Sequence, residues 1–138
     1  MDTSMDIIEL NRVEVEELED MLDEYDRAYI QYKIEGAIHI GIKQDGQLIA
    51  GVDACMTSFK ILYISTVYVD ERYRRLGLGT KLMGEVEKRA RELGANMIRL
   101  DTFDWQGREF YLALGYEQAG NYTSVEDGFS EYFFVKRV

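Results

Sequence analysis

The sequence of 138 residues lacks proline altogether and contains a single cysteine and a single histidine. Because Cys55 is the only cysteine, no internal disulfide can form, which fits a reducing, cytoplasmic setting. The lone His39 falls in a segment that reads as a strand, where an isolated histidine usually serves the structure. No low-complexity tract or internal repeat is present. The chemistry of this protein must therefore be sought in other residue types.

Long apolar runs are also missing. The first ten residues, MDTSMDIIEL, contain neither a basic nor an apolar segment, so we expect no secretory signal. The longest nearly apolar run, Ile61–Val69, is far too short to span a bilayer, and we expect no membrane partner. Hydrophobic residues make up 46% of the chain, which is ample for a folded globule. Length and composition together predict a single cytoplasmic domain over residues 1–138.

Positive charge is scarce, because 16 Lys and Arg residues stand against 26 Asp and Glu, a net charge of −10. This balance argues against general nucleic-acid binding, which relies on a cationic surface. The whole excess lies in residues 1–58, which hold 4 basic and 14 acidic residues, whereas residues 59–138 hold 12 of each. The first part would attract cations and leave the second free to accept an anion. A solvated acidic helix is the simpler interpretation of the first part.

A helix is the first element that the sequence predicts. Asn11 and Glu14 have the spacing of a capping box. An apolar stripe follows at helical spacing, formed by Val15, Leu18, Leu22, Tyr25, Tyr29 and Tyr32. We expect one long helix, or two with a break, that ends near Glu35–Gly36.

Strands and helices alternate over the rest of the chain. Ile38, Ile40 and Ile42 alternate with smaller or polar residues before Gln44-Asp45-Gly46, which predicts a hairpin. The later predictions are a buried strand over Ile61–Val69, a helix from Leu78 to Gly94, a strand over Asn96–Phe103, a helix over Arg108–Leu114, and strands over Tyr116–Tyr122 and Ser130–Lys136. This order implies a mixed sheet with a parallel strand pair beside a glycine-rich turn.

That turn reads DERYRRLGLGT, residues 70–80, and places three arginines directly before Gly77 and Gly79 at a helix start. The first turn of a helix has unpaired N–H groups and about half a positive charge from the macrodipole, so an anion is expected there. The glycines let phosphate oxygens approach the backbone. Leu82 excludes the dinucleotide fingerprint, and Gly-Lys-Ser/Thr of the P-loop is absent. Taken alone, the turn could equally be a tight basic turn.

Three landmarks together resemble the GNAT superfamily of N-acetyltransferases. Arg74–Gly79 is similar to its Arg/Gln-x-x-Gly-x-Gly/Ala signature, and EFYLALGY, Glu109–Tyr116, is similar to its second landmark. The segment DTFDWQG, Asp101–Gly107, resembles the Asp-Thr-Phe-x-Phe-Gln-Ala stretch of a bacterial subgroup. The landmarks span Ile61–Tyr116 in the family's order, whereas residues 1–58 carry no such motif.

The resemblance implies an α+β fold in α/β/α layers, with a mixed, mostly antiparallel twisted sheet. In the family, two neighbouring parallel strands splay apart and acetyl-coenzyme A (acetyl-CoA) fills the gap. The implied cofactor-binding residues are Val67, Val69, Arg74, Arg75, Leu76, Gly77, Leu78, Gly79, Thr80, Gln106 and Tyr111. Backbone N–H groups of residues 75–80 would hold the pyrophosphate, and the backbone of Val67 and Val69 would pair with the pantetheine amides.

Two catalytic roles follow from the same resemblance. The N–H of Val67 is the candidate donor to the carbonyl oxygen, which becomes negative during acetyl transfer. Tyr111 matches the family's general acid, because a phenol with a pKa near 10 stays protonated at neutral pH and donates to the departing sulfur. Simple packing in a helix is the alternative role of this tyrosine. We assign no metal ligand.

The sequence departs from the family at several positions. Tyr63 stands where the family often has an acidic residue, eleven positions before its glycine motif, so Glu35, Asp53 or a water chain are alternatives for the base. Asp104 replaces a common asparagine, and Gln106 is a candidate to replace its contact with the cofactor. Trp105 is expected either to line the acceptor pocket or to belong to the core.

The sequence thus predicts an acetyl-CoA-dependent N-acetyltransferase. The expected acceptor is the primary amine of a small cationic compound, such as a polyamine or an aminoglycoside-like molecule, or an exposed lysine of a protein. The alternative is a catalytically inactive GNAT-fold module that binds coenzyme A (CoA) and regulates or recruits a partner, supported only by the missing strand carboxylate. The C-terminal segment EYFFVKRV is apolar enough to allow a homodimer by analogy.

Overall fold

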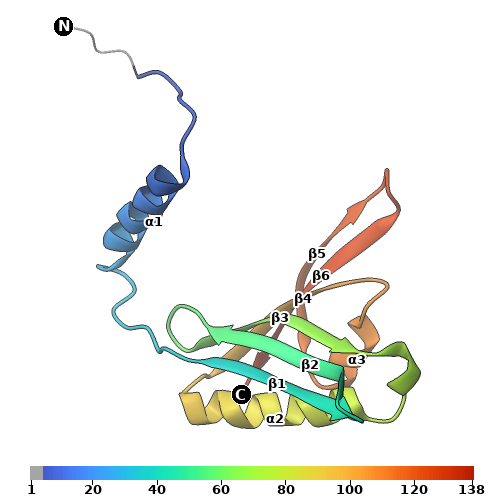
Figure 1. Cartoon of the computed structure of the whole chain (residues 1–138). Coiled ribbons are helices and arrows are strands. Elements are labelled where there is room, and N and C mark those ends of the chain that lie inside the picture. The colour runs from blue at the N-terminus through green and yellow to red at the C-terminus, as the bar shows by residue number, and fades with distance from the viewer. Residues whose placement is uncertain (1–4) are drawn as a thin grey trace, which may run out of the picture. The chain divides into compact units, whose positions relative to one another are not determined.

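A computed structural model describes residues 5–138 of the chain, which fall into two compact units divided between Gln31 and Tyr32 (Figure 1). Residues 1–4 of the stretch inspected for a secretory signal lie outside the described part. A single domain over residues 1–138 stays a prediction. None of the helices within residues 5–138 is long and apolar enough to cross a membrane.

The first unit contains helix α1, Arg12–Asp26. The predicted capping box is confirmed, because the Asn11 side chain accepts the N–H of Glu14 at 2.8 Å and the Glu14 carboxylate accepts the N–H of Asn11 at 3.1 Å. The predicted end near Glu35–Gly36 is wrong. Negative side chains crowd the last turn, where the macrodipole disfavours them, and the turn itself contains no basic residue, although the C-cap Arg27 pairs with Glu24 at 2.8 Å. None of the residues of α1 is buried.

Six strands form one sheet in the second unit, in the order β1-β2-β3-β4-β6-β5. Their bounds are Ala37–Gln44 for β1, Gln47–Met56 for β2, Ile61–Val69 for β3, Met97–Phe103 for β4, Glu117–Ser124 for β5 and Phe129–Arg137 for β6. The hairpin turn is confirmed at Asp45 and Gly46, both of which have positive φ. β6 is hydrogen-bonded on both edges, so a dimer could not form by adding a strand to it.

The strands β3 and β4 form the predicted parallel pair and diverge along their length. Their pairing covers only Ile61–Ile64 opposite Met97–Leu100, although β3 continues to Val69 and β4 to Phe103. The register of β2 against β3 also shifts between Asp53 and Ala54, which leaves Ser65 as an extra residue on β3. The splayed pair is therefore confirmed, with an irregular strand at the point of divergence.

Helices α2, Leu78–Leu93, and α3, Arg108–Ala113, share one hydrophobic core with the sheet. Figure 1 shows α2 running beneath the strands β1 and β2. Its apolar stripe is buried as predicted, and Gly94 ends it with a φ of 99°. The side chains that are most completely buried are Phe134, Ile38, Leu62, Met83, Ile98, Leu100 and Val86. Burying each stabilises the fold by about 1.5–3 kcal/mol, and together they fix the strands around the splay.

Candidate active site

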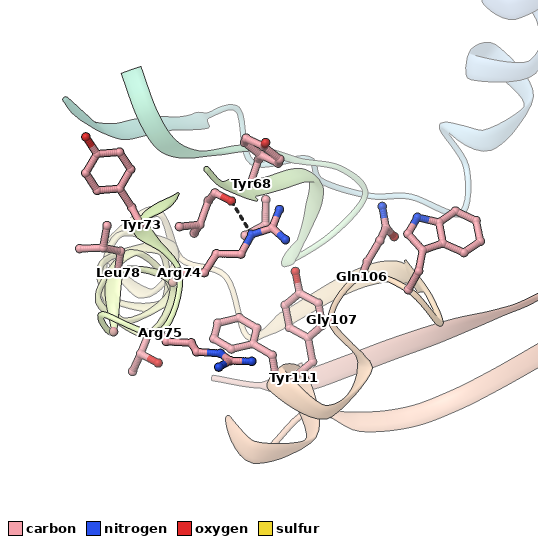
Figure 2. Close-up of a pocket in the computed structure, with 15 residues that line it drawn as sticks. Tyr68, Tyr73, Arg74, Arg75, Leu78, Gln106, Gly107 and Tyr111 are labelled. Carbon is pink, nitrogen blue, oxygen red and sulfur yellow. Dashed lines mark hydrogen bonds between the residues drawn. The ribbon is translucent and has the colours of Figure 1, made fainter. Parts of the chain in front are cut away.

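The site begins at the turn between β3 and α2, where a short 3-10 helix, Glu71–Tyr73, follows β3. The Arg74 side chain donates from Nε to the carbonyl oxygen of Val69 at 2.8 Å, which ties the turn to the end of the strand (Figure 2). Arg75 and Gly77 both have left-handed backbone conformations, with φ of 66° and 78°. This path delivers the chain to the start of α2, whose first N–H groups have no partner within the helix.

A cavity of about 570 Å³ opens beside this turn. It is lined by Val67, Tyr68, Val69, Tyr73, Arg74, Arg75, Gly77, Leu78, Gly79, Thr80, Trp105, Gln106, Gly107, Phe110 and Tyr111. Ten of the eleven residues predicted to bind the cofactor are among them. Leu76 is the exception, because its side chain points to solvent and is 66% exposed. Sequence reasoning did not assign Tyr68, Tyr73 or Phe110 to the cofactor site, although Phe110 lies within the landmark Glu109–Tyr116.

The lining of this cavity suits a diphosphate attached to an elongated organic group. Its volume lies within the range of small-molecule sites. The first turn of α2 contains no acidic residue, and Arg74 and Arg75 both border the cavity. A Cβ atom at Gly79 would lie 3.1 Å from the Phe110 ring, a tight contact, so glycine leaves room between the start of α2 and this ring. The residues present therefore fit CoA.

A second cavity of about 280 Å³ lies where β3 and β4 diverge. Its lining includes residues 64–67 of β3 and 100–102 of β4, two stretches that begin at the last paired residues of the two strands. Val67, Gln106 and Tyr111 line this cavity and the larger one. The two cavities therefore meet at the predicted oxyanion donor and the predicted general acid.

Tyr111 is held firmly at this junction. Its N–H donates to the Gly107 carbonyl at 3.0 Å, and its ring contacts those of Phe110, Tyr116 and Phe134. Burial raises the pKa of Tyr111 to about 12, so the phenol stays protonated at neutral pH. Figure 2 shows its hydroxyl pointing into the space between Arg74 and Gln106. This geometry suits a proton donor.

In the segment after β4, one polar side chain stabilises the fold and another borders the cavities. The Asp104 carboxylate accepts the N–H of Ser130 at 2.9 Å and lines neither cavity. Gln106 borders both cavities, and its side-chain oxygen accepts the N–H of Phe103 at 2.8 Å. Trp105 stacks on Phe103 with ring centroids 4.6 Å apart and lines the larger cavity. The expectation that Trp105 belongs to the core is wrong, since it is 66% exposed, whereas a place in the acceptor pocket stays a prediction.

The two carboxylates considered as bases lie elsewhere. Glu35 and Asp53 line neither cavity, and the Asp53 Oδ1 lies 3.1 Å from His39 Nε2. The smaller cavity instead contains Asp101 of β4, which sequence reasoning missed in this role. No local signal marked it, because Asp101 lies just beyond the last β3–β4 pairs, Tyr63 with Arg99 and Ile64 with Leu100.

Comparisons with known proteins agree with this geometry. The sequence matches the Acetyltransferase (GNAT) family over residues 5–116. A stretch of 78 residues is 32% identical to a blasticidin-S acetyltransferase from Streptomyces morookaense and covers 56% of this chain and 57% of that relative. A crystal structure of an acetyltransferase from Bacillus cereus ATCC 14579 matches with a TM-score of 0.90 and 30% identity, covering 97% of this chain and 98% of that chain. An aminoglycoside 6'-N-acetyltransferase complexed with coenzyme A matches with a TM-score of 0.63 and 18% identity over 92% of each chain.

The chain therefore belongs to the GNAT family of acetyltransferases. The family and the fold predicted from the sequence are both confirmed, while the narrower bacterial subgroup stays a prediction. The acyl donor of the family is acetyl-CoA, as expected. The chain spans little more than half the length of the blasticidin-S relative, so the acceptor does not follow from that likeness.

Proposed function

We propose that this protein is an acetyl-CoA-dependent N-acetyltransferase that transfers the acetyl group directly to a primary amine. The observation that carries the proposal is the meeting of two cavities at Val67, Gln106 and Tyr111. One cavity suits an elongated diphosphate ligand and the other a smaller polar group. Two substrates, one in each cavity, would bring their reacting atoms together at this junction, as direct transfer requires.

The roles proposed for the larger cavity follow from its backbone. N–H groups of Arg75, Gly77, Gly79 and Thr80 hold the diphosphate, and Arg74 and Arg75 add longer-range attraction. The backbone of Val67 and Val69 pairs with the pantetheine amides as an added strand would. When bound, acetyl-CoA supplies the thioester that the amine attacks.

The chemical roles belong to two residues at the junction. The N–H of Val67 donates to the thioester oxygen as negative charge develops on it. Tyr111 donates its hydroxyl proton to the departing sulfur. The raised pKa of Tyr111 supports this role, because the proton is available at every pH near neutrality.

The acceptor is proposed to be a small cationic amine or an exposed lysine side chain. The relative that acts on blasticidin-S and the structural neighbour that acts on an aminoglycoside support a small acceptor. Of the acidic residues in 1–58, Glu35, Asp45 and Asp53 belong to the second unit, and none of these three lines either cavity.

Release of free CoA tests the proposal. The full chain is incubated with acetyl-CoA and 1,4-diaminobutane, lysine amide or an aminoglycoside, and the thiol is detected with a dye. Because Cys55 is exposed and would react as well, the protein without amine provides the blank. Amine-dependent thiol release and an acetylated product by mass spectrometry are expected. Binding of acetyl-CoA by calorimetry without turnover of any amine would favour the inactive CoA-binding module instead.

A further inference from the structure

We propose that Asp101 is the acceptor-binding carboxylate of this enzyme, which holds the ammonium group of a cationic amine beside Tyr111 and takes up one of its protons. The inference rests on the proposed N-acetyltransferase function and deepens it by naming the residue that selects the substrate. It also supplies from β4 the carboxylate that is missing from β3, where Tyr63 stands.

The position of Asp101 is set by the divergence of the two central strands. It directly follows Leu100, the last residue of β4 that pairs with β3, and lines the cavity that opens there. The same cavity is bordered by Val67 and Tyr111, the proposed oxyanion donor and general acid. A group held by Asp101 would therefore lie in the smaller cavity, next to the residues at which the thioester is proposed to react. No other acidic or basic side chain is among the described residues that line this cavity.

The hydrogen bonding of Asp101 leaves it able to receive a cation. Its Oδ2 accepts the hydroxyl of Tyr63 at 2.9 Å, which fixes the orientation of the carboxylate. Within residues 5–138, no hydrogen bond to Oδ1 and no ion pair of Asp101 is formed. Arg99, which is two residues away on the same face of β4, lies 4.3 Å over the Tyr63 ring instead. One oxygen and the full negative charge therefore remain for an ammonium N–H.

Tyr63 acts as a positioning residue in this arrangement. The hydrogen bond to the Asp101 carboxylate is the first cause of the raised pKa of Tyr63, so the phenol remains a donor across the working range of pH. The guanidinium of Arg99 packs on the face of the same ring and restricts its movement. The residue found in place of the usual strand carboxylate thus orients a carboxylate on the neighbouring strand.

The acetyl transfer balances with Asp101 in this role. One N–H proton of the ammonium passes to Oδ1 of Asp101, directly or through one water, which frees the nitrogen lone pair. The nitrogen then forms the C–N bond to the acetyl carbon, and the C–S bond breaks. The hydroxyl proton of Tyr111 goes to the sulfur, and the second proton leaving the nitrogen restores the phenol. Asp101 finally returns its proton to solvent.

The test compares Asp101→Asn with the wild-type chain on two acceptors. One is 1,4-diaminobutane, which is cationic, and the other is methoxyamine, a primary amine that is uncharged at neutral pH. We expect kcat/KM for the diamine to fall about 100-fold, because both charge pairing and proton uptake are lost, whereas methoxyamine is nearly unaffected. The affinity for acetyl-CoA, measured by calorimetry, should not change. Asp53→Asn is the matched control, because Asp53 is an exposed strand carboxylate that lines neither cavity.

A second variant, Tyr63→Phe, tests whether Tyr63 orients the Asp101 carboxylate for the acceptor or serves only to stabilise the fold. It keeps the charge of Asp101 and removes the hydrogen bond that orients it. We therefore expect kcat/KM for the diamine to fall, but by less than in Asp101→Asn, and kcat/KM for methoxyamine to stay unchanged. Equal losses on both acceptors in Asp101→Asn, or no loss on the diamine, would overturn the assignment of Asp101 and leave the proposed function standing. A wild-type chain that binds acetyl-CoA but acetylates none of these amines, nor lysine amide or an aminoglycoside, would overturn the proposed function, and this inference with it.

Discussion

Among single residues, Tyr111 is the one on which the chemistry depends most. Its hydroxyl lies where both cavities meet, and its ring is packed among three other aromatic rings. Tyr111→Phe keeps that packing and removes only the proton that would go to sulfur. We expect kcat to fall about 100-fold or more with little change in the affinity for acetyl-CoA, as steady-state kinetics and calorimetry would measure. An unchanged rate would remove Tyr111 from the mechanism.

Tyr116→Phe is the matched control for that variant. Tyr116 is also a buried tyrosine, but it lines neither cavity, and its hydroxyl has no hydrogen-bond partner among the described residues. Removing an unsatisfied buried hydroxyl should raise the free energy of unfolding by about 1 kcal/mol. Activity should stay at the wild-type level.

The titration of Tyr111 also predicts the shape of the pH–rate profile. Burial raises the pKa of Tyr111 to about 12, above the ordinary value near 10, so the acid form persists as the pH rises. The rate should therefore show no fall below about pH 11 that is due to this tyrosine. A descending limb near pH 9 that disappears in Tyr111→Phe would contradict the assignment.

At the scale of elements, the glycine-rich turn and the first turn of α2 form the anion site. Gly77 has a left-handed backbone conformation, and a side chain there would meet no atom within 4 Å. Gly77→Ala would therefore act through the backbone alone, at a cost of about 1–2 kcal/mol. Gly79 differs, because it has ordinary helical backbone and a Cβ atom there would lie 3.1 Å from the Phe110 ring.

Gly79→Glu tests the anion site directly. It places bulk and negative charge where the diphosphate is proposed to lie, and the affinity for CoA should fall by about 100-fold or more in calorimetry. Gly84→Glu is the matched control, because it makes the same change on the exposed face of the same helix, in open space and away from both cavities. Equal affinities for the two variants, each checked for folding by circular dichroism, would place the diphosphate elsewhere.

The elements were largely predictable from the sequence because their signals are local. Residues within a few positions of one another predict three of these features: the strand β3, the end of α2 at Gly94 and the hairpin at Asp45-Gly46. The end of α1 was not predictable in this way, because the apolar spacing continues past Asp26 while the charges of its last turn oppose it. The role proposed for Asp101 depends on where β4 leaves β3, which only the folded sheet determines.

At the scale of the whole fold, one partly buried ion pair joins elements that are distant in the sequence. The Nζ of Lys136 in β6 lies 2.8 Å from Oε1 of Glu87 in α2. The same Nζ donates to the carbonyl oxygen of Leu114, just after α3, at 2.7 Å. This contact fixes α3, and with it Tyr111, against the sheet. Glu87→Gln should lower the free energy of unfolding by about 2 kcal/mol in urea denaturation, because it leaves the ammonium without its counter-charge.

Glu85→Gln provides the comparison on the same helix. Glu85 pairs with Arg89 at 3.0 Å on the exposed side of α2, where solvent screens the charges. Its loss should change stability far less than the loss of Glu87. Equal effects of the two variants would show that the link between α2, α3 and β6 does not hold the site together.

A crystal structure of the full chain with CoA bound measures the central claim most directly. The diphosphate is predicted to contact the N–H groups of residues 75–80, with the pantetheine arm along Val67 and Val69 and the sulfur next to the Tyr111 hydroxyl. A nucleotide bound away from the turn before α2, or a pantetheine arm that does not enter between β3 and β4, would contradict the account.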